Sequence, residues 1–306
     1  MWTIVNTPDQ NEAVALREVE EPSPAPHEAV VTVEAFSLNR GEIMLMRMRP
    51  PGWRPGQDIA GTVLRPAADG SGPPAGTPIV GLTEGAGWSE RAAVRTDRMV
   101  VRDARVPIEP WAVLPIPGLT ALRALRRGGL LLGRPVMITG ATGIVGEIAI
   151  QLAAMAGARV TAIGRRDAAP ALTALGASAV HETPGEAEGL FDLILESSGG
   201  ATLTGAIGRV APGGAIVVYG NTSGEPAPFS FRDFGGHQNA RIETLFHFTC
   251  EPASAFAADL ATLAGLLSSG RLTIGVAGAH GWRDLPRVVG ELRGSRFRGK
   301  HVFRLG

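Results

Sequence analysis

The sequence predicts an α/β fold with two parts: a strand-rich part at the start and a doubly wound parallel sheet in the middle. In the first third, short strand-like segments are separated by Pro/Gly clusters at 50–56 and 70–76, which is typical of a compact β domain. From about residue 115, short apolar runs alternate with segments of helical period. This alternation favours parallel βαβ units.

The strands of the first part are expected at 28–36, 59–66 and 88–96. The 28–36 segment, EAVVTVEAF, is rich in β-branched residues, which favour extended backbone. At the other end of the chain, KHVFRL at 300–305 also reads as a strand.

The middle part begins with the apolar run PVMITG at 135–140, which predicts a buried strand. A helix follows, because its apolar residues recur with helical spacing up to Gly157: Val145, Ile148, Ala149, Leu152 and Ala156. Further strands are expected at 158–164, in ASAVHE, at 191–199 and at 213–221, with a helix at 169–177.

The composition describes an ordinary globular protein, with 44% apolar and 19% charged residues among 306. The net charge of zero gives no electrostatic reason to expect nucleic acid or an anionic membrane as a partner. One cysteine, Cys250, provides no disulfide framework, and no apolar run reaches the length of a membrane span. The start lacks the features of a signal peptide, so we expect a cytoplasmic enzyme or binding protein.

The segment TGATGIVG at 139–146 lies between the predicted strand and helix, where glycine-rich turns bind phosphate groups. It departs from the usual G-x-G-x-x-G pattern because Ala141 replaces one glycine and Gly140 precedes it. Gly143 allows close approach of a pyrophosphate, and Gly146 allows close packing of helix on strand. A turn without a ligand is the alternative, but the surrounding strand-turn-helix-strand order favours dinucleotide binding.

NADPH is favoured over NADH by the end of the second strand, Gly164-Arg165-Arg166. An NAD site usually has an acid there for the ribose 2′-hydroxyl, but no acid occurs before Asp167. Two guanidinium groups can pair with a 2′-phosphate. Because arginine is common in this chain, the missing acid counts for more than the arginines.

Several motifs in order resemble the medium-chain dehydrogenase/reductase superfamily, and within it the zinc-free quinone oxidoreductase branch. They are SLNRGEIMLM (37–46), RPGQDIAGTV (54–63), GLTALRAL (118–125), VMITGATGIVGEIAIQLA (136–153), VTAIGRR (160–166), LESSGG (195–200), APGGAIVVYGNTSG (211–224) and the terminal GKHVFRL. The resemblance spans nearly the whole chain.

The resemblance implies a GroES-like catalytic domain formed by 1–114 and 272–306, and a Rossmann NADP-binding domain formed by 115–271. It also implies a homodimer or homotetramer. Cofactor and substrate would meet between the two domains.

Carried over onto this sequence, the resemblance places two sets of residues at the cofactor. Those expected along the pyrophosphate and the ribose phosphate are Ala141, Thr142, Gly143, Ile144, Val145, Gly164, Arg165 and Arg166. Those expected toward the nicotinamide are Asn39, Thr120, Ser197, Gly220, Asn221 and Thr222.

The chain departs from two relatives. Zinc-dependent members carry a G-H-E motif and a catalytic cysteine, where this chain has Gly56-Gln57-Asp58 and a cysteine far downstream. Metal catalysis is therefore not expected. Enoyl-thioester reductases use a tyrosine of the N-terminal domain, and Tyr219, the single tyrosine, lies in the other half.

Without a metal, hydride transfer to a quinone or an α,β-unsaturated carbonyl needs donors for the developing negative charge on oxygen. Asn39 and Thr120 are candidates, and Asp58 is a candidate proton relay. Asn39 and Asp58 each have a structural alternative that stays equally open. Asn39 would cap a helix that starts near Arg40, and Asp58 would cap a turn. Trp88 and Trp53 either stack on an aromatic substrate or pack in the protein, and packing is the commoner role.

Two other functions stay open: a non-catalytic NADPH-binding or redox-sensing protein, and an enoyl-thioester reductase. Substrate choice is expected to depend on the segments 46–56 and 237–248.

Overall fold

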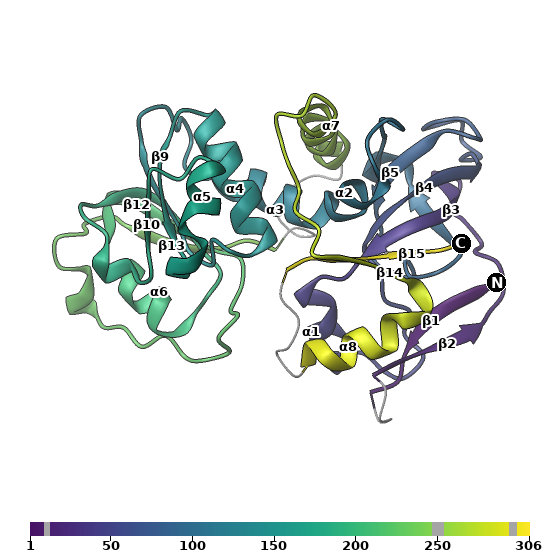
Figure 1. Ribbon diagram of the computed structural model, residues 1–306, viewed down its shortest axis with the longest axis horizontal. Helices are drawn as coiled ribbons and strands as arrows, with labels where there is room; N and C mark the ends of the chain where they lie inside the picture. Colours follow the sequence, from purple (N-terminus) through teal and green to yellow (C-terminus); the bar gives the residue numbers. More distant parts are fainter. Residues whose placement is uncertain (9–12, 247–253, 294–298) are drawn as a thin grey trace. The chain divides into compact units, whose positions relative to one another are not determined.

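The computed structural model describes residues 1–8, 13–246, 254–293 and 299–306. Internal contacts divide the chain into two compact units, one made of Met1–Ile116 with Glu251–Gly306 and the other of Pro117–Cys250 (Figure 1). Residues 247 and 248 of the expected specificity segment lie outside the described residues. No helix in the described part of the chain is long and apolar enough to cross a membrane.

The first unit is rich in β-strands, as its Pro/Gly-punctuated sequence predicts. Its strands are β1 (Trp2–Asn6), β2 (Val14–Glu18), β3 (Glu28–Ser37), β4 (Asp58–Arg65), β5 (Pro78–Leu82), β6 (Arg91–Arg95), β7 (Met99–Val101), β14 (Gly278–Gly281) and β15 (His301–Arg304). Its helices are α1 (Arg40–Met48), η1 (Thr96–Arg98), α2 (Ile108–Val113), α7 (Ser254–Ser268), η5 (Trp282–Asp284) and α8 (Leu285–Arg293).

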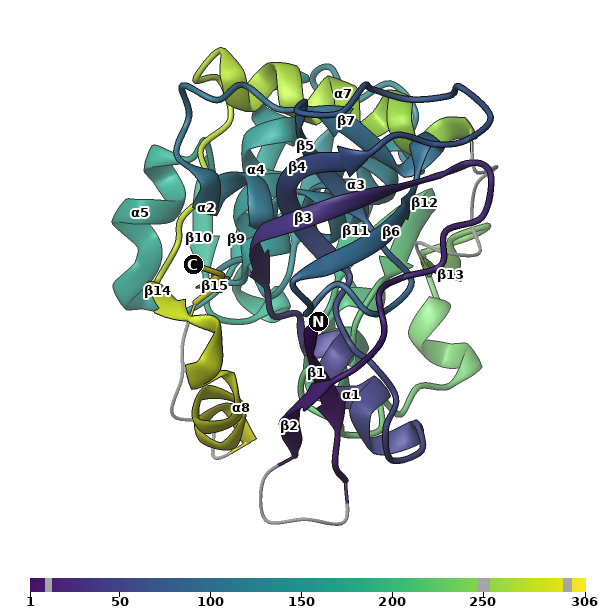
Figure 2. The ribbon, with the colours of Figure 1, turned by 90° about the vertical axis from the view of Figure 1, so that its right-hand side faces the viewer.

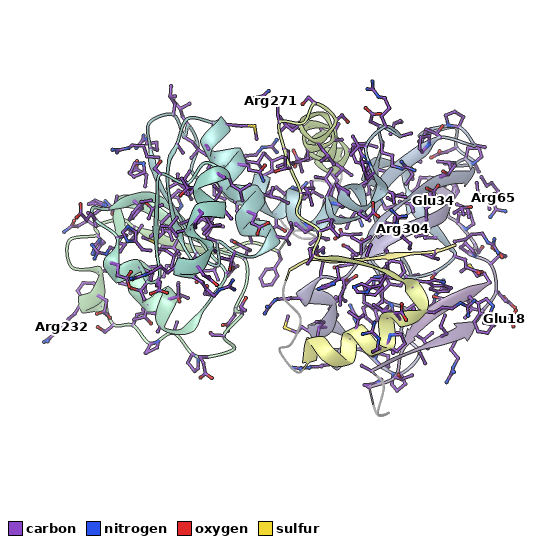
Figure 3. The ribbon with its side chains drawn as sticks, viewed as in Figure 1. Glu18, Glu34, Arg65, Arg232, Arg271 and Arg304 are labelled. Atoms are coloured by element: carbon purple, nitrogen blue, oxygen red, sulfur yellow. The ribbon has the colours of Figure 1, made fainter. Side chains whose placement is uncertain are left out.

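The main sheet of this unit runs in the order β14-β15-β3-β4-β5-β7, with β6 paired to β3, while β1 and β2 form a separate hairpin. Figure 2 shows α8 and the hairpin on one side of the sheet and α7 on the other. Glu34 of β3 and Arg304 of β15, both labelled in Figure 3, form ion pairs with Arg102 and with Glu109 of α2, respectively.

The C-terminal strand β15 completes the core of the first unit. The ring of Phe36 stacks on Phe303 of β15 at 5.4 Å and on Trp88 at 5.6 Å between ring centroids. Trp88 is fully buried and its ring N–H donates to the carbonyl of Ser37, so it is a core residue and does not stack on a substrate.

The second unit alternates strand and helix along the chain, as the sequence predicts. It contains α3 (Pro115–Arg126, which begins in the first unit), β8 (Pro135–Ile138), α4 (Ile144–Met155), β9 (Arg159–Ile163), η2 (Arg166–Ala168), α5 (Ala169–Ala174), β10 (Ala179–His181), η3 (Pro184–Glu186), β11 (Phe191–Glu196), α6 (Gly200–Ile207), β12 (Val210–Val218), η4 (Phe231–Phe234) and β13 (Arg241–Thr244).

The sheet of the second unit is parallel throughout and runs in the order β10-β9-β8-β11-β12-β13. Met137 of β8 packs in one core cluster with Ile207 of α6, while its neighbours Val136 and Ile138 point to the opposite face. Helix α4 contacts β8 and β9. The strand order reverses between β8 and β11, and ligands of such sheets bind at the carboxyl ends of the strands where this reversal occurs.

Helix α7 differs from the expected domain division, because it lies in the first unit and the sequence assigns residues up to 271 to the second. It contacts β7 and η1, and the guanidinium of Arg98 lies 5.3 Å from the ring centroid of Phe256. An apolar helical period does not specify which sheet the helix covers, so the sequence could not reveal this packing.

Substitution of two glycines in helices, Gly146 in α4 and Gly265 in α7, tests how closely α4 packs on the turn before it. A Cβ at Gly146 would lie 2.7 Å from the backbone Cα of Ala141, whereas one at Gly265 in α7 would meet nothing within 4 Å. Gly146→Ala should therefore destabilise the protein by about 1–3 kcal/mol through overpacking. Gly265→Ala should stabilise it by about 0.5–1 kcal/mol. Urea unfolding of both variants checks this, and equal effects would contradict the close approach at Gly146.

Candidate functional site: a phosphate-binding turn and a buried polar cluster

In the turn between β8 and α4, Gly140 takes the role of the glycine that the usual pattern has at position 141. Gly140 has a φ of +57°, whereas Ala141 is not among the residues with positive φ. The conformation that requires glycine therefore falls on Gly140, and an alanine at 141 carries no backbone strain. Ala141 is fully buried, and its N–H donates to the carbonyl of Ile163 at 3.1 Å.

The first turn of α4 supplies the N–H groups that can bind phosphate. Gly143 is the N-cap of α4, makes no side-chain cap, and is exposed. The N–H of Glu147 donates to the carbonyl of Gly143. The N–H groups of Ile144 and Val145 come earlier in the helix, in the first turn, where backbone N–H groups have no acceptor within the helix. Ala141 cannot offer its own N–H, because Ile163 accepts it.

The end of β11 contacts the turn after β8, across the place where the strand order reverses. A Cβ at Gly140 would lie 2.4 Å from Ser197 Oγ, so a side chain at position 140 would force this hydroxyl to move. Thr222 donates its N–H to Ser197 at 2.9 Å, and Gly220 lies close enough that a Cβ there would be 3.1 Å from the Ser197 carbonyl. The ends of β8, β11 and β12 are thereby joined around Ser197.

A buried carboxylate, which sequence reasoning did not identify as important, supports this junction. Glu196 is fully buried and accepts hydrogen bonds from Thr139 Oγ1 at 3.0 Å and from the N–H groups of Ser198 and Gly199 at 2.8 and 3.1 Å. Burial raises its pKa, although these bonds oppose the shift. Its position at the end of an apolar strand was the available sequence signal.

The expected ribose end of the site lies beside the turn. Gly164 packs against Thr142, since a Cβ at Gly164 would lie 3.2 Å from the Thr142 methyl group. Arg165 and Arg166 follow and are both exposed. The second unit thus brings together the residues expected at the cofactor: Ala141, Thr142, Gly143, Ile144, Val145, Gly164, Arg165, Arg166, Ser197, Gly220, Asn221 and Thr222.

These residues fit a dinucleotide. The helix N-terminus offers N–H groups and a positive dipole to a pyrophosphate, glycines keep the approach open, and two exposed arginines follow β9. Asn221 and Thr222, which the resemblance places toward the nicotinamide, are exposed. Within 1–8, 13–246, 254–293 and 299–306, no three His, Cys, Asp or Glu side chains are grouped so that they could hold a metal ion.

In the first unit, Asn39 and Asp58 meet in a buried cluster. Asn39 Nδ2 donates to Asp58 Oδ2 at 2.7 Å, and Ser37 Oγ donates to the same oxygen at 3.2 Å. The other oxygen, Asp58 Oδ1, accepts the N–H of Ile116 in the first turn of α3 at 2.7 Å. Asp58 is fully buried at the start of β4, and its Oδ1 caps the first turn of α3 and not the turn that precedes β4.

Lys300, the only lysine of the chain, holds the other end of the Asn39 amide. Its Nζ donates to Asn39 Oδ1 at 2.5 Å and to the Leu38 carbonyl at 3.1 Å, and lies 3.7 Å from Asp58 Oδ2. With a donor on its oxygen and an acceptor at its nitrogen, the amide has one orientation. Burial lowers the pKa of Lys300, and the nearby carboxylates of Asp58 and Glu42 oppose that shift.

Asn39 is the N-cap of α1, as the alternative interpretation of the sequence proposed. Its backbone N–H donates to Glu42 Oε2 at 2.7 Å, and the Glu42 N–H donates back to the Asn39 carbonyl at 3.1 Å. Burial, and next the charge of Asp58, raise the pKa of Glu42 to about 8. The N-x-x-E spacing was a signal for this carboxylate that sequence reasoning did not use.

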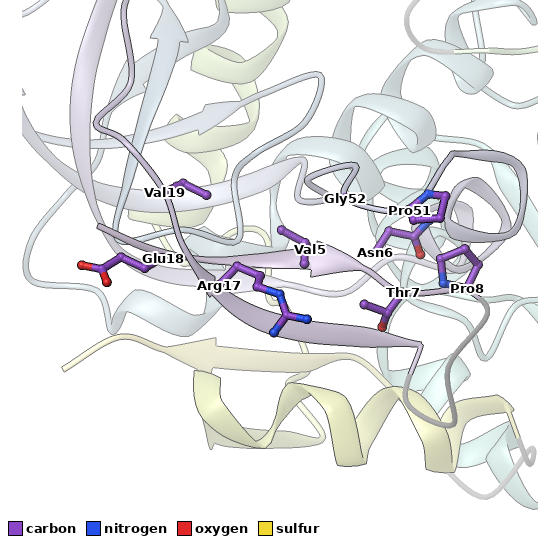
Figure 4. Close-up of a pocket in the computed structure, with 9 residues that line it drawn as sticks. All are labelled: Val5, Asn6, Thr7, Pro8, Arg17, Glu18, Val19, Pro51 and Gly52. Atoms are coloured by element: carbon purple, nitrogen blue, oxygen red, sulfur yellow. The ribbon is translucent and has the colours of Figure 1, made fainter.

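The remaining expected residue, Thr120, is buried in α3 of the second unit. A cavity of about 410 Å³ lies elsewhere, between the ends of β1 and β2 and the turn at Pro51 and Gly52. Figure 4 shows Arg17 and Glu18 among its lining residues. None of the residues expected at the cofactor lines it, but Pro51 and Gly52 belong to the 46–56 segment on which substrate choice is expected to depend.

The raised pKa of Glu42 predicts a pH-dependent stability. Between the unfolded pKa near 4.5 and the folded pKa of about 8, the folded protein binds more protons than the unfolded chain. The free energy of unfolding should therefore fall as pH rises from 5 to 8, by a few kcal/mol at most. In Glu42→Gln this fall should be smaller, while in Glu188→Gln, which alters an exposed carboxylate, it should match the wild type. Denaturant unfolding across this range measures it, and identical slopes in all three proteins would contradict the assignment.

Comparison with known proteins adds the family. The profile of the zinc-binding dehydrogenase family matches residues 145–264. The chloroplast envelope quinone oxidoreductase homolog of Arabidopsis thaliana is 35% identical over 49% of this chain and 51% of its own length. The acrylyl-CoA reductase AcuI of Ruegeria pomeroyi is 31% identical over 57% of this chain and 58% of its own. The chain thus spans little more than half the length of these curated relatives.

Among solved structures, a mycobacterial protein complexed with NADPH superposes with a TM-score of 0.87, at 20% identity, over all of both chains. That likeness supports the fold, with a GroES-like domain and a Rossmann domain. The profile and the curated relatives show that the chain belongs to the medium-chain dehydrogenase/reductase superfamily and is quinone oxidoreductase-like.

Proposed function

We propose that the protein is an NADPH-dependent, metal-independent reductase that transfers hydride to a quinone or an α,β-unsaturated carbonyl compound. The observation that carries this proposal is the phosphate-binding turn at the strand reversal, with Gly140 fitted against Ser197 and the α4 N-terminus open. The solved relative that contains NADPH and the Arabidopsis quinone oxidoreductase homolog support the choice of cofactor and reaction.

The second unit would hold the cofactor through main-chain N–H groups and two arginine side chains. The N–H groups of Ile144 and Val145 would bind the pyrophosphate, and Arg165 and Arg166 the 2′-phosphate. Ser197, Gly220, Asn221 and Thr222 would lie toward the nicotinamide. NADPH, when bound, supplies the hydride; the protein fixes the reacting atoms and excludes water.

The first unit would stabilise charge that develops on the substrate oxygen. Asn39 carries a second amide N–H besides the one given to Asp58, so it can donate to that oxygen. Asp58 is fully buried, and we therefore assign it a positioning role through Asn39 in place of a direct proton transfer. The proton for the product can come from water.

An enoyl-thioester reductase is the second candidate, because the acrylyl-CoA reductase AcuI is 31% identical over 57% of this chain. Non-catalytic NADPH binding, as in a redox sensor, is the third. Each predicts a different outcome with the same acceptors.

Steady-state NADPH oxidation with a panel of quinones, enones and enoyl thioesters distinguishes these functions. We expect turnover with quinones or enones that is unchanged by a metal chelator, since the turn and the amide cluster need no metal. Faster turnover with thioesters would favour the second candidate. Saturable binding of NADPH without turnover on any acceptor would leave only the third.

We further propose a homodimer, or a homotetramer built from it, that forms in the cytoplasm. Strand β13 is the edge of the second sheet within the described residues, and Ile242 on it is 36% exposed. The outer side of an edge strand carries backbone N–H and C=O groups that can pair with another chain. Light scattering should show a dimer that Ile242→Lys weakens at least about tenfold, since the charge would lose its hydration on pairing. A monomeric wild type would refute this part of the proposal.

A further inference from the structure

The arginines expected to bind a 2′-phosphate are already paired with carboxylates. Arg165 Nε lies 2.9 Å from Asp167 Oδ1, and an Arg166 guanidinium nitrogen lies 3.5 Å from Glu182 Oε2. All four side chains are about half exposed or more. The place where the phosphate would lie therefore holds two positive and two negative charges.

Glu182 reaches this place from the neighbouring strand. Strand β10 runs parallel to β9 with His181 opposite Ile163, and the N–H of Gly164 donates to the His181 carbonyl at 2.9 Å. Glu182 therefore leaves β10 at the level where Gly164 and Arg165 leave β9. Its Oε1 accepts the backbone N–H of Arg166 at 3.4 Å.

The backbone at Glu182 is held in this position. Its N–H donates to Glu186 Oε2 at 3.2 Å, and Thr183 Oγ1 donates to Glu186 Oε1 at 3.1 Å. A carboxylate fixed beside the end of the second strand stands where the acid of an NAD site accepts the ribose 2′-hydroxyl, although it comes from the next strand. The same carboxylate repels a 2′-phosphate and competes with it for Arg166.

We propose that Glu182 determines cofactor choice in this protein. It accepts the 2′-hydroxyl of NADH and occupies Arg166 in competition with the 2′-phosphate of NADPH, so the chain binds both coenzymes and prefers NADPH less than about tenfold. The inference rests on the proposed function, because it concerns the same dinucleotide site.

The test is calorimetric titration with NADPH, NADH, adenosine 2′,5′-bisphosphate and AMP. In Glu182→Gln, the dissociation constants of NADPH and the bisphosphate should fall about three- to tenfold, because a negative charge beside the phosphate is removed. Those of NADH and AMP should stay unchanged or rise. Glu188→Gln, in the same exposed segment, is the matched control and should behave as the wild type.

Arg166→Gln provides the second arm. This substitution should weaken the binding of NADPH and leave the binding of NADH almost unchanged. When Glu182→Gln is added to Arg166→Gln, it should improve NADPH binding less than it does in the wild type. Equal changes for both coenzymes in Glu182→Gln, or no change in their ratio, would overturn the inference and leave the proposed reductase intact. A wild type that binds neither coenzyme would overturn both.

Discussion

The contact between Gly140 and Ser197 is the constraint on which the rest of the site depends. It joins the ends of β8 and β11, the two strands where the parallel sheet reverses its order, and the positive φ of Gly140 favours glycine there. Glu196 lies behind this contact and fixes the loop after β11 through two backbone N–H groups. The α4 N-terminus can face a pyrophosphate because this junction holds the turn in place.

A second constraint organises the first unit. Lys300 directly precedes strand β15 and lies beside the N-terminus of α1. Its ammonium group orients the Asn39 amide and offsets the charge of Asp58. Removing one member of such a buried group leaves an uncompensated charge, which is costly. We therefore see the cluster as the support that gives Asn39 a defined orientation, with Asp58 and Lys300 acting through it.

Much of the fold follows from local sequence patterns, because strand and helix periods are local properties. The segments expected at 28–36, 135–140, 158–164 and 191–199 correspond to β3, β8, β9 and β11. The features that sequence missed are contacts between distant residues: Lys300 with Asn39, α7 with β7, and Glu182 with Arg166. Glu182 directly follows the next strand, β10, so spacing along the chain could not predict its contact with Arg166.

The central claim is that the turn at Gly140–Gly146 binds the pyrophosphate of a pyridine dinucleotide. Isothermal titration of the purified protein with NADPH tests it most directly. We predict a saturable site on each chain, occupied at micromolar to submillimolar coenzyme. Absence of any binding heat at millimolar NADPH and NADH, with thermal stability also unchanged by either, would contradict it.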